Sequence, residues 1–152
     1  ELIGIMGNEG VGKSTLLNTI TAQERAIVDE EPGTTRDLVN AQFLFEGKRI
    51  EIIDTCGLRK PSRVREPVAF YSMVRAMRVI ESADTIILLF DTTQGVVEQD
   101  RRIASLVMAK AKGLVIAPNK IDLISKQNSQ RIISSTYKSF VKFASPTTFS
   151  VF

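Results

Sequence analysis

The sequence predicts an α/β fold of three layers with a mostly parallel sheet, because short apolar runs alternate with segments of helical periodicity. The run from Thr85 to Phe90 has the length and the apolar composition of a buried strand. In residues 66–82, apolar side chains recur at every third or fourth position, as in an amphipathic helix. A glycine-rich loop lies between the first apolar run and the first helical segment. Ligands of such folds bind at the carboxyl ends of the strands, so the loop is expected at the binding edge.

The remaining elements follow in the same alternation. Strands are expected at Leu2–Met6, Val39–Phe45, Arg49–Ile53, Thr85–Phe90, Leu114–Ala117 and Thr148–Phe152. Helices are expected from Leu16 onward, over Glu66–Ser82, over Glu98–Ala111, and around Ile133, Tyr137, Phe140 and Val141. The turn Glu46-Gly47-Lys48 joins the second and third strands as an antiparallel hairpin. We interpret the apolar stripes of the helices as surface that faces the core.

The composition is that of one globular domain, expected over residues 1–152, with 43% hydrophobic residues. Since no apolar run approaches the roughly 18 residues of a membrane span, no membrane partner is expected. The single cysteine excludes an internal disulfide framework and favours a cytoplasmic protein. The lack of histidine excludes histidine metal sites and histidine general bases. A net charge of +3 permits an RNA partner without predicting one.

The glycine-rich loop fits the pattern G-x-x-x-x-G-K-[ST] of a phosphate cradle. Its glycines allow backbone conformations that a Cβ would block, and the following helix adds free N–H donors and a positive dipole end. Lys13 can reach the terminal phosphates, and the Ser14 hydroxyl can ligate a magnesium ion. The candidate nucleotide-binding residues of this loop are Gly7, Asn8, Glu9, Gly10, Val11, Gly12, Lys13, Ser14 and Thr15.

A second phosphate element follows the strand Arg49–Ile53. An aspartate at the carboxyl end of a core strand can orient a magnesium-bound water, which is the role expected of Asp54. Gly57 can bring its N–H against a γ-phosphate because no side chain intervenes. The candidate nucleotide-binding residues of this segment are Asp54, Thr55, Cys56, Gly57 and Leu58.

The third motif, Asn119-Lys120-Ile121-Asp122, follows the strand Leu114–Ala117 and distinguishes guanine from adenine. The Asp122 carboxylate can accept hydrogen bonds from the N1–H and the exocyclic amino group of guanine. Adenine lacks this donor pair and would leave a carboxylate unpaired, at a cost of about 1–3 kcal/mol. Asn119 is expected to brace the loop and touch the base, and the stem of Lys120 is expected to pack over the ring. The three motifs together predict a guanine-nucleotide domain with the fold of Ras-like G domains.

A fourth segment, Pro32-Gly33-Thr34-Thr35-Arg36-Asp37, lies between the two phosphate elements. A threonine here can bind magnesium and the γ-phosphate in the triphosphate state and release them after hydrolysis, as an order–disorder switch. Thr35 is the preferred candidate. The expected metal ligands are therefore Ser14, Thr35 and Asp54.

The Pro-Gly-Thr-Thr-Arg-Asp and Asp-Thr-x-Gly-Leu stretches resemble those of the Era-like GTPases. Within that branch, Tyr71–Ala76, Asp91–Gly95 and Glu98-Gln99-Asp100 resemble the EngA (Der) family, and Leu58-Arg59-Lys60 is similar to the second of its two tandem GTPase domains. The resemblance implies a cytoplasmic bacterial GTPase that uses Mg²⁺, binds GTP and GDP, and assists maturation of the large ribosomal subunit. The implied partners are the ribosome or ribosomal RNA, contacted through the family's other domains, and DNA is not expected.

The chain departs from the family at three places. Gly10 replaces an asparagine that in relatives helps to hold an activating potassium ion, so weak or no potassium activation is expected. The Ser-Ala of the family's purine loop corresponds to Ser150-Val151, which makes these residues altered candidates for base contact. The domain is also expected to be cut off before its final helix, without the companion GTPase domain and the RNA-binding-like C-terminal domain.

Hydrolysis is expected to be slow. Leu58 stands where Ras-type proteins carry a water-orienting glutamine, and leucine cannot hydrogen-bond a water. The expected catalytic groups are Lys13, the Thr35 backbone and the Gly57 N–H. Together with magnesium they assist the in-line attack of water on the γ-phosphate. Arg36 is a candidate for a cation supplied in cis.

Three alternatives remain open at this point. The domain could be a guanine-nucleotide binding or docking module that seldom hydrolyses, as Leu58 and Gly10 suggest. It could be the G domain of a tRNA-modification GTPase, which shares the Gly-Thr-Thr-Arg-Asp stretch. A phosphate-loop protein that uses ATP is the weakest alternative, because the Asn-Lys-x-Asp motif would then have no guanine to recognise.

Overall fold

The fold was analysed in a computed structural model, which describes residues 1–23, 41–46, 48–54, 68–141 and 149–151. The described strands are β1 (Leu2–Met6), β2 (Ala41–Phe45), β3 (Lys48–Asp54), β4 (Thr85–Asp91), β5 (Gly113–Asn119) and β6 (Phe149–Val151). The described helices are α1 (Lys13–Gln23), α2 (Val68–Ser82), α3 (Glu98–Ala109), the short 3₁₀ turn η2 (Ile121–Leu123) and α4 (Lys126–Val141). The predicted alternation of strands and helices is confirmed.

The described strands form one sheet in the order β2-β3-β1-β4-β5-β6. Among these described strands, the pairs β1–β3, β1–β4, β4–β5 and β5–β6 are parallel, and only β2–β3 is antiparallel. The mostly parallel sheet with one antiparallel hairpin strand is therefore confirmed. Because β1 lies between β3 and β4, the loop after β1 opens at the edge where Asp54 ends β3 and Asp91 ends β4.

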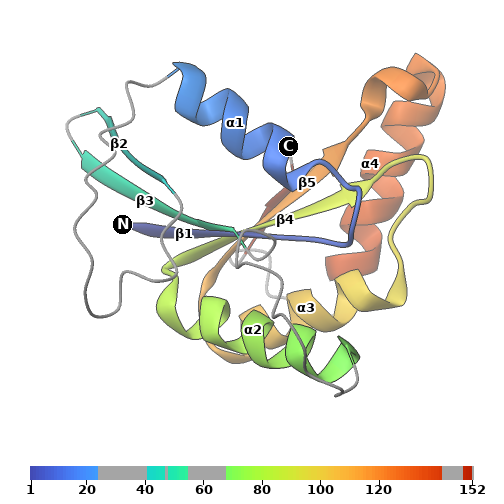
Figure 1. The fold of residues 1–152 in the computed structure, drawn as a ribbon. Coiled ribbons are helices and arrows are strands. Elements are labelled where there is room, and N and C mark those ends of the chain that lie inside the picture. The colour runs from blue at the N-terminus through green and yellow to red at the C-terminus, as the bar shows by residue number, and fades with distance from the viewer. Residues whose placement is uncertain (24–40, 47, 55–67, 142–148, 152) are drawn as a thin grey trace.

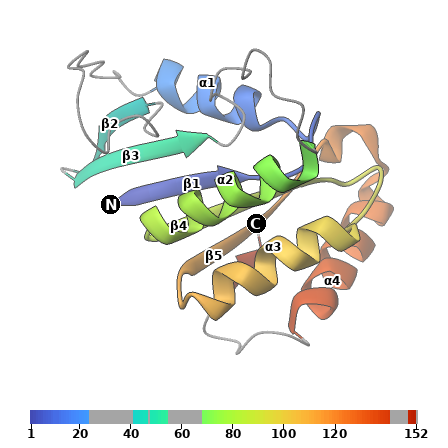
Figure 2. The same cartoon turned by 60° about the horizontal axis from the view of Figure 1, so that its bottom comes forward.

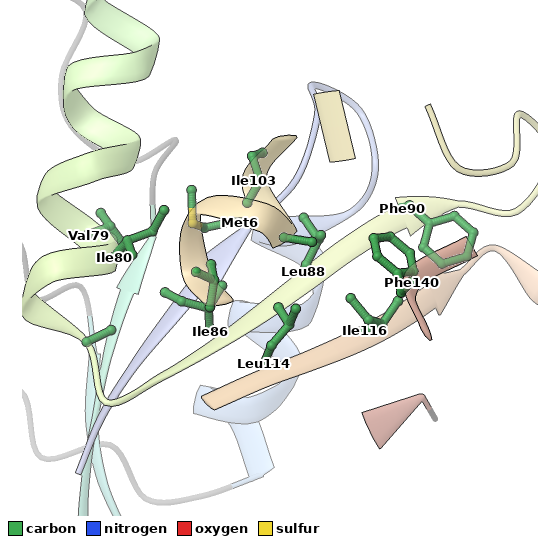
Figure 3. Close-up of a cluster of buried hydrophobic side chains, with 13 residues drawn as sticks. Met6, Val79, Ile80, Ile86, Leu88, Phe90, Ile103, Leu114, Ile116 and Phe140 are labelled. Carbon is green, nitrogen blue, oxygen red and sulfur yellow. The ribbon is translucent and has the colours of Figure 1, made fainter. Parts of the chain in front are cut away.

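Helices cover both faces of the sheet (Figures 1 and 2). α1 lies on one face, whereas α2, α3 and α4 follow one another across the opposite face. The period of two in β4 explains why both faces are apolar: Ile86, Leu88 and Phe90 belong to the core under α2, α3 and α4, while Leu89 belongs to the core under α1. Figure 3 shows Phe140 of α4 beside Phe90 and Ile116, which anchors the last helix on the sheet.

Helix α3 ends at Ala109, not at Ala111 as the apolar spacing predicts. The N–H of Lys112 bonds to the Val107 carbonyl (3.2 Å) and the N–H of Ala111 to the Met108 carbonyl (3.0 Å). Ala111 itself has a φ of 53°. This is the hydrogen-bond pattern of a Schellman motif, with alanine where glycine is usual. The helix stops here because the chain must reverse in order to start β5 at Gly113.

Strand β5 is longer than predicted at its carboxyl end and includes Pro118. Proline weakens a strand signal because it has no N–H for the ladder. Among the described strands, only β4 flanks Pro118, since the described part of β6 pairs with Leu114, Val115 and Ile116.

In α4, Ile133 is 37% exposed, and Ile132 packs against the core instead, so the expectation that Ile133 faces the core is wrong. The ends of the other predicted elements at 39–40, 66–67, 148 and 152 lie outside the described residues.

Candidate functional site

The predicted phosphate loop runs from the end of β1 to the first turn of α1. Lys13 is the first residue of α1 and is only 4% exposed. Its ammonium donates to the carbonyl oxygens of Gly7 (2.8 Å) and Asn8 (2.6 Å). These two bonds hold the cation against the loop, while Ser14 and Thr15 are exposed in the first turn of the helix. The loop therefore presents a fixed positive charge, a helix N-terminus and a hydroxyl at one place, which suits a phosphate chain.

The phosphate loop touches the base motif directly. The side-chain amide of Asn119, the last residue of β5, donates to the carbonyl oxygen of Val11 at 2.7 Å. Gly12 makes this approach possible, because a Cβ at this position would lie 2.3 Å from the Asn119 Nδ2, and the φ of Gly12 is +101°. Asn119 therefore braces the loop through its side chain, as predicted, and brings together two motifs that lie far apart in the sequence.

The rest of the base motif forms a tight turn after β5. Lys120 adopts a left-handed conformation with φ 60°, and Asp122 follows in η2 with its side chain exposed. The turn closes through the N–H of Leu123, which bonds to the Lys120 carbonyl at 3.0 Å. This leaves Asp122 accessible to a ligand, as base recognition requires.

Lys120 is held by a partner that the sequence reasoning missed. Its ammonium lies 2.7 Å from Oδ2 of Asp91, whose other carboxyl oxygen accepts from the N–H (2.9 Å) and the hydroxyl (2.6 Å) of Thr93. The bond from Lys120 and then that from Thr93 lower the pKa of the Asp91 carboxyl from 3.8 to about 2, although burial opposes this change. Asp91 is therefore an anion that fixes the far end of the lysine.

A second buried carboxylate, Asp100, supports the phosphate end. Its Oδ1 accepts from the side-chain amide of Asn8 in the loop (3.0 Å), and its Oδ2 accepts from the N–H of Val97 at the start of α3 (3.0 Å). Burial raises the pKa of the Asp100 carboxyl, because the residue is 1% exposed and its side-chain partner is a neutral amide. Asp91 ends strand β4 and Asp100 lies in the first turn of α3. Both lie in stretches that resemble the EngA (Der) family, but the sequence analysis assigned neither aspartate a role in the site.

The expected metal ligands are partly described. Ser14 lies in the first turn of α1, and the backbone of Asp54 pairs in parallel register with Ile5 of β1, at the edge where the phosphate loop begins. Within the described segments, no group of three or more histidine, cysteine, aspartate or glutamate residues could hold a metal ion. Among the expected ligands whose side chains are described, the exposed Ser14 hydroxyl suits a Mg²⁺ ion, which usually takes few protein oxygens and completes its shell with phosphate oxygens and water.

The remaining predicted site residues stay predictions. Thr35, Arg36, Thr55, Cys56, Gly57 and Leu58 lie outside the described residues. Ser150 and Val151 form part of β6, opposite Val115 and Ile116 of β5. That register places them before the end of β5 and not beside Asn119, so their predicted contact with the base stays a prediction.

Comparison with known proteins agrees with this geometry. Residues 2–120 match the family model described as 50S ribosome-binding GTPase, which covers the phosphate loop and the start of the base motif. The chain belongs to this family of 50S ribosome-binding GTPases. It is similar to GTPase Der from Borreliella burgdorferi (42% identity over 144 residues, 95% of the chain and 33% of the relative). It is also similar to GTPase Der from Agathobacter rectalis (41% over 127 residues, 84% and 29%). The chain thus spans about a third of the length of these relatives.

Solved structures of other GTPases share the fold of this family member. Era from Aquifex aeolicus bound to GDP·AlF₄⁻ superposes with a TM-score of 0.70 at 26% identity, over 99% of the chain and 50% of Era. Era in complex with MgGDPNP and nucleotides 1506–1542 of 16S ribosomal RNA also gives 0.70, at 29% identity, over 99% and 49%. The elongation factor SelB from Methanococcus maripaludis gives a TM-score of 0.73 at 15% identity, over 99% of the chain and 28% of SelB, which supports the fold alone.

In the segments that the structure describes, no helix has the length and apolarity needed to cross a bilayer.

Proposed function

We propose that this domain binds GTP and GDP and hydrolyses GTP slowly, as a nucleotide-dependent switch in assembly of the large ribosomal subunit. The observation that carries the proposal is the 2.7 Å bond from Asn119 to the Val11 carbonyl, which unites a phosphate loop and a guanine motif in one site. Membership of the 50S ribosome-binding GTPases supports both the activity and the ribosomal partner. The proposal places the domain in the cytoplasm, which its single cysteine favours.

The described residues suit the binding step. The Lys13 ammonium, already oriented by two loop carbonyls, neutralises the β- and γ-phosphates, and the loop N–H groups with the α1 N-terminus bind their oxygens. Ser14 and Asp54 are the proposed protein ligands of Mg²⁺, with Thr35 added in the triphosphate state. When bound, Mg²⁺ neutralises charge that develops on the phosphates. The exposed Asp122 carboxylate accepts two hydrogen bonds from guanine, and Asn119 holds the two ends of the site together.

In the hydrolysis step, water attacks the γ-phosphorus in line, the bond to the β-phosphate oxygen breaks, and GDP and phosphate leave. Lys13 and the Gly57 N–H stabilise the charge of the transferred group, and the Thr35 backbone orients the water. Leu58 provides no hydrogen bond to that water, so the intrinsic rate is slow, of the order of the ~10⁻⁴ s⁻¹ known for Ras without its activator.

The first experiment measures GTP, GDP and ATP affinity by calorimetry on the chain and on its Lys13→Ala and Asp122→Asn variants. The proposal expects GTP and GDP to bind at least about 100-fold tighter than ATP, from two charge-assisted hydrogen bonds to guanine. Lys13→Ala should weaken all nucleotides, whereas Asp122→Asn should weaken only the guanine nucleotides. Equal affinity for ATP and GTP in the parent chain would overturn the proposal.

Leu58 also favours a second function, that of a binding module that signals by nucleotide occupancy and seldom hydrolyses. Single-turnover release of phosphate, measured with and without ribosomes, separates the two functions. A measurable rate that ribosomes increase supports the switch, and tight guanine binding without hydrolysis in either condition supports the module.

Potassium is proposed to have little effect on hydrolysis because Gly10 carries no side chain to help hold the ion. A Cβ at Gly10 would meet no atom within 4 Å, and asparagine tolerates the observed φ of +74° better than most residues. Gly10→Asn therefore tests the role of this position in potassium activation without introducing a clash. The ratio of turnover in KCl to turnover in NaCl should stay close to one in the parent and rise in the variant. A several-fold potassium response of the parent would contradict this.

A further inference from the structure

We infer that Asp91 is a positioning residue for guanine recognition: it fixes the ammonium of Lys120, so that the alkyl stem of that lysine becomes a rigid wall of the base site. The inference rests on the proposed function, since it assigns a further residue to the base end of the same site. Asp91 does not belong to any of the three nucleotide motifs, and it acts only through Lys120.

The Asp91 carboxylate is itself held rigidly. The residue is 6% exposed, and both of its oxygens are occupied, Oδ2 by Lys120 at 2.7 Å and Oδ1 by the N–H and hydroxyl of Thr93 at 2.9 and 2.6 Å. A carboxylate with both oxygens bonded cannot rotate without breaking charge-assisted hydrogen bonds. It is therefore a fixed anchor, not a mobile surface charge.

The anchor removes freedom that Lys120 would otherwise have. A lysine side chain has many rotamers, and an unanchored one must lose them when a ring packs against its stem. With its ammonium tied to Asp91, the stem is ordered before the ligand arrives, which is the preorganisation that increases affinity. The backbone of Lys120 is in the left-handed region (φ 60°), so the residue is constrained at both ends.

The segment that contains Asp91 also holds the preceding residue of the motif. The N–H and hydroxyl of Thr92 both donate to the Asn119 carbonyl, at 3.1 and 2.7 Å. In the sheet, Asp91 and Asn119 are partners in the parallel register of β4 and β5. The end of β4 therefore positions both Asn119 and Lys120 and leaves the exposed Asp122 to read the base.

The test compares Asp91→Asn with the parent chain by displacement of a fluorescent GDP analogue, using GDP and ADP as competitors. Asparagine keeps an oxygen for Thr93 but cannot pair with the ammonium, so GDP affinity should fall about tenfold, the effect of losing one charge-assisted bond. ADP gains nothing from Asp122, so its affinity should change by less than about threefold. The matched control is Glu81→Gln, which removes a carboxylate–lysine pair of the same kind (Glu81–Lys110, 3.1 Å) at an exposed place away from the site and should alter neither affinity.

A double-mutant cycle with Lys120→Met separates positioning from folding. If Asp91 acts through the ammonium, Asp91→Asn should cause no further loss of GDP affinity in the Lys120→Met background. An additive loss in that cycle, or a folded Asp91→Asn protein that keeps the parent's ratio of GDP to ADP affinity, would overturn the inference. If Asp91→Asn does not fold, Thr93→Val replaces it, because residue 93 is exposed and its hydroxyl bonds to the same carboxylate. That variant should lower GDP affinity about threefold, and an unchanged ratio would again overturn the inference.

A parent chain that does not prefer GDP to ADP would instead overturn the proposed function and this inference with it. Failure at Asp91 alone, with a parent that prefers GDP, leaves the proposed function intact.

Discussion

Asp91 ends β4 and Asp100 lies in the first turn of α3, and both are buried, yet their environments shift their pKa values in opposite directions. Asp91 faces a lysine, and its pKa falls to about 2. Asp100 faces the neutral amide of Asn8, and burial raises its pKa. The difference shows that burial alone does not set the pKa of a carboxyl. At Asp91 the bonds from Lys120 and Thr93 more than offset the loss of solvent, whereas at Asp100 the Val97 N–H and the Arg101 charge do not. The base end of the site is therefore held by an ion pair and the phosphate end by a weaker bond.

The phosphate loop and the base motif meet at Gly12, and a substitution there is expected to have the largest effect on GDP affinity. Gly12→Ala places a Cβ 2.3 Å from the Asn119 amide, so it should break the bond to Val11 and separate the phosphate loop from the base motif. We expect a loss of at least about 100-fold in GDP affinity, measured by calorimetry. Gly10→Ala is the matched control, because it also has a positive φ (+74°) but no atom within 4 Å of the added Cβ. Equal losses in the two variants would show that backbone strain, and not the joint between the two ends, is responsible.

The pH dependence of stability should differ in sign for the two carboxyls. Asp91, with a lowered pKa, contributes stability above pH 3.8 that is lost as the pH falls towards 2. Asp100, with a raised pKa, contributes stability at acid pH that is lost as the pH rises through its raised value. Thermal unfolding of Asp91→Asn and Asp100→Asn across pH 2.5–7 measures this. Asp91→Asn should unfold several degrees below the parent at pH 7, with a smaller difference at pH 2.5. For Asp100→Asn, the unfolding temperature should fall furthest below that of the parent at the acid end of this range.

A substitution at Asn8 can give the buried carboxylate of the phosphate end a charged partner, as the carboxylate of the base end already has. Asn8→Lys offers Asp100 the kind of partner that Asp91 already has, and it should lower the pKa of the Asp100 carboxyl. We expect a gain of about 1 kcal/mol in the free energy of unfolding at pH 7, the usual order for a bond to a charged group that is partly buried. Urea unfolding measures this gain, with Asn8→Met as the control for side-chain length. A gain of equal size in the methionine variant would point to packing and not to charge.

The smallest effect is expected at the exposed pair Glu81–Lys110, whose side chains are 55% and 42% exposed. Solvent screens such a pair, so Glu81→Gln should change the free energy of unfolding by less than about 0.5 kcal/mol in urea. This variant provides the baseline against which losses at the buried pair are compared. A loss as large as that of Asp91→Asn would show that burial does not distinguish the two lysine–carboxylate pairs.

Most of the fold could be predicted from the sequence, because the periods of its apolar residues are local properties. The run Thr85–Phe90 and the spacing in 66–82 each identify an element without knowledge of its neighbours. The predicted ends of elements are wrong where an adjoining element determines the local conformation. Ala111 takes a left-handed conformation where the chain turns into β5, and Pro118 lies in a part of β5 that, in the described part of the chain, only β4 flanks.

The candidate site could likewise be predicted from the sequence, because a glycine loop with its lysine and an Asn-Lys-x-Asp turn are each defined within a few residues. The partners that hold these motifs were not, because they come from distant positions. Asn119 is 108 residues from Val11, Asn8 is 92 from Asp100, and Lys120 is 29 from Asp91. Only the strand order β3-β1-β4-β5 brings these residues to one edge of the sheet. Burial there, together with the partners of each carboxyl, then lowers the pKa of Asp91 and raises that of Asp100.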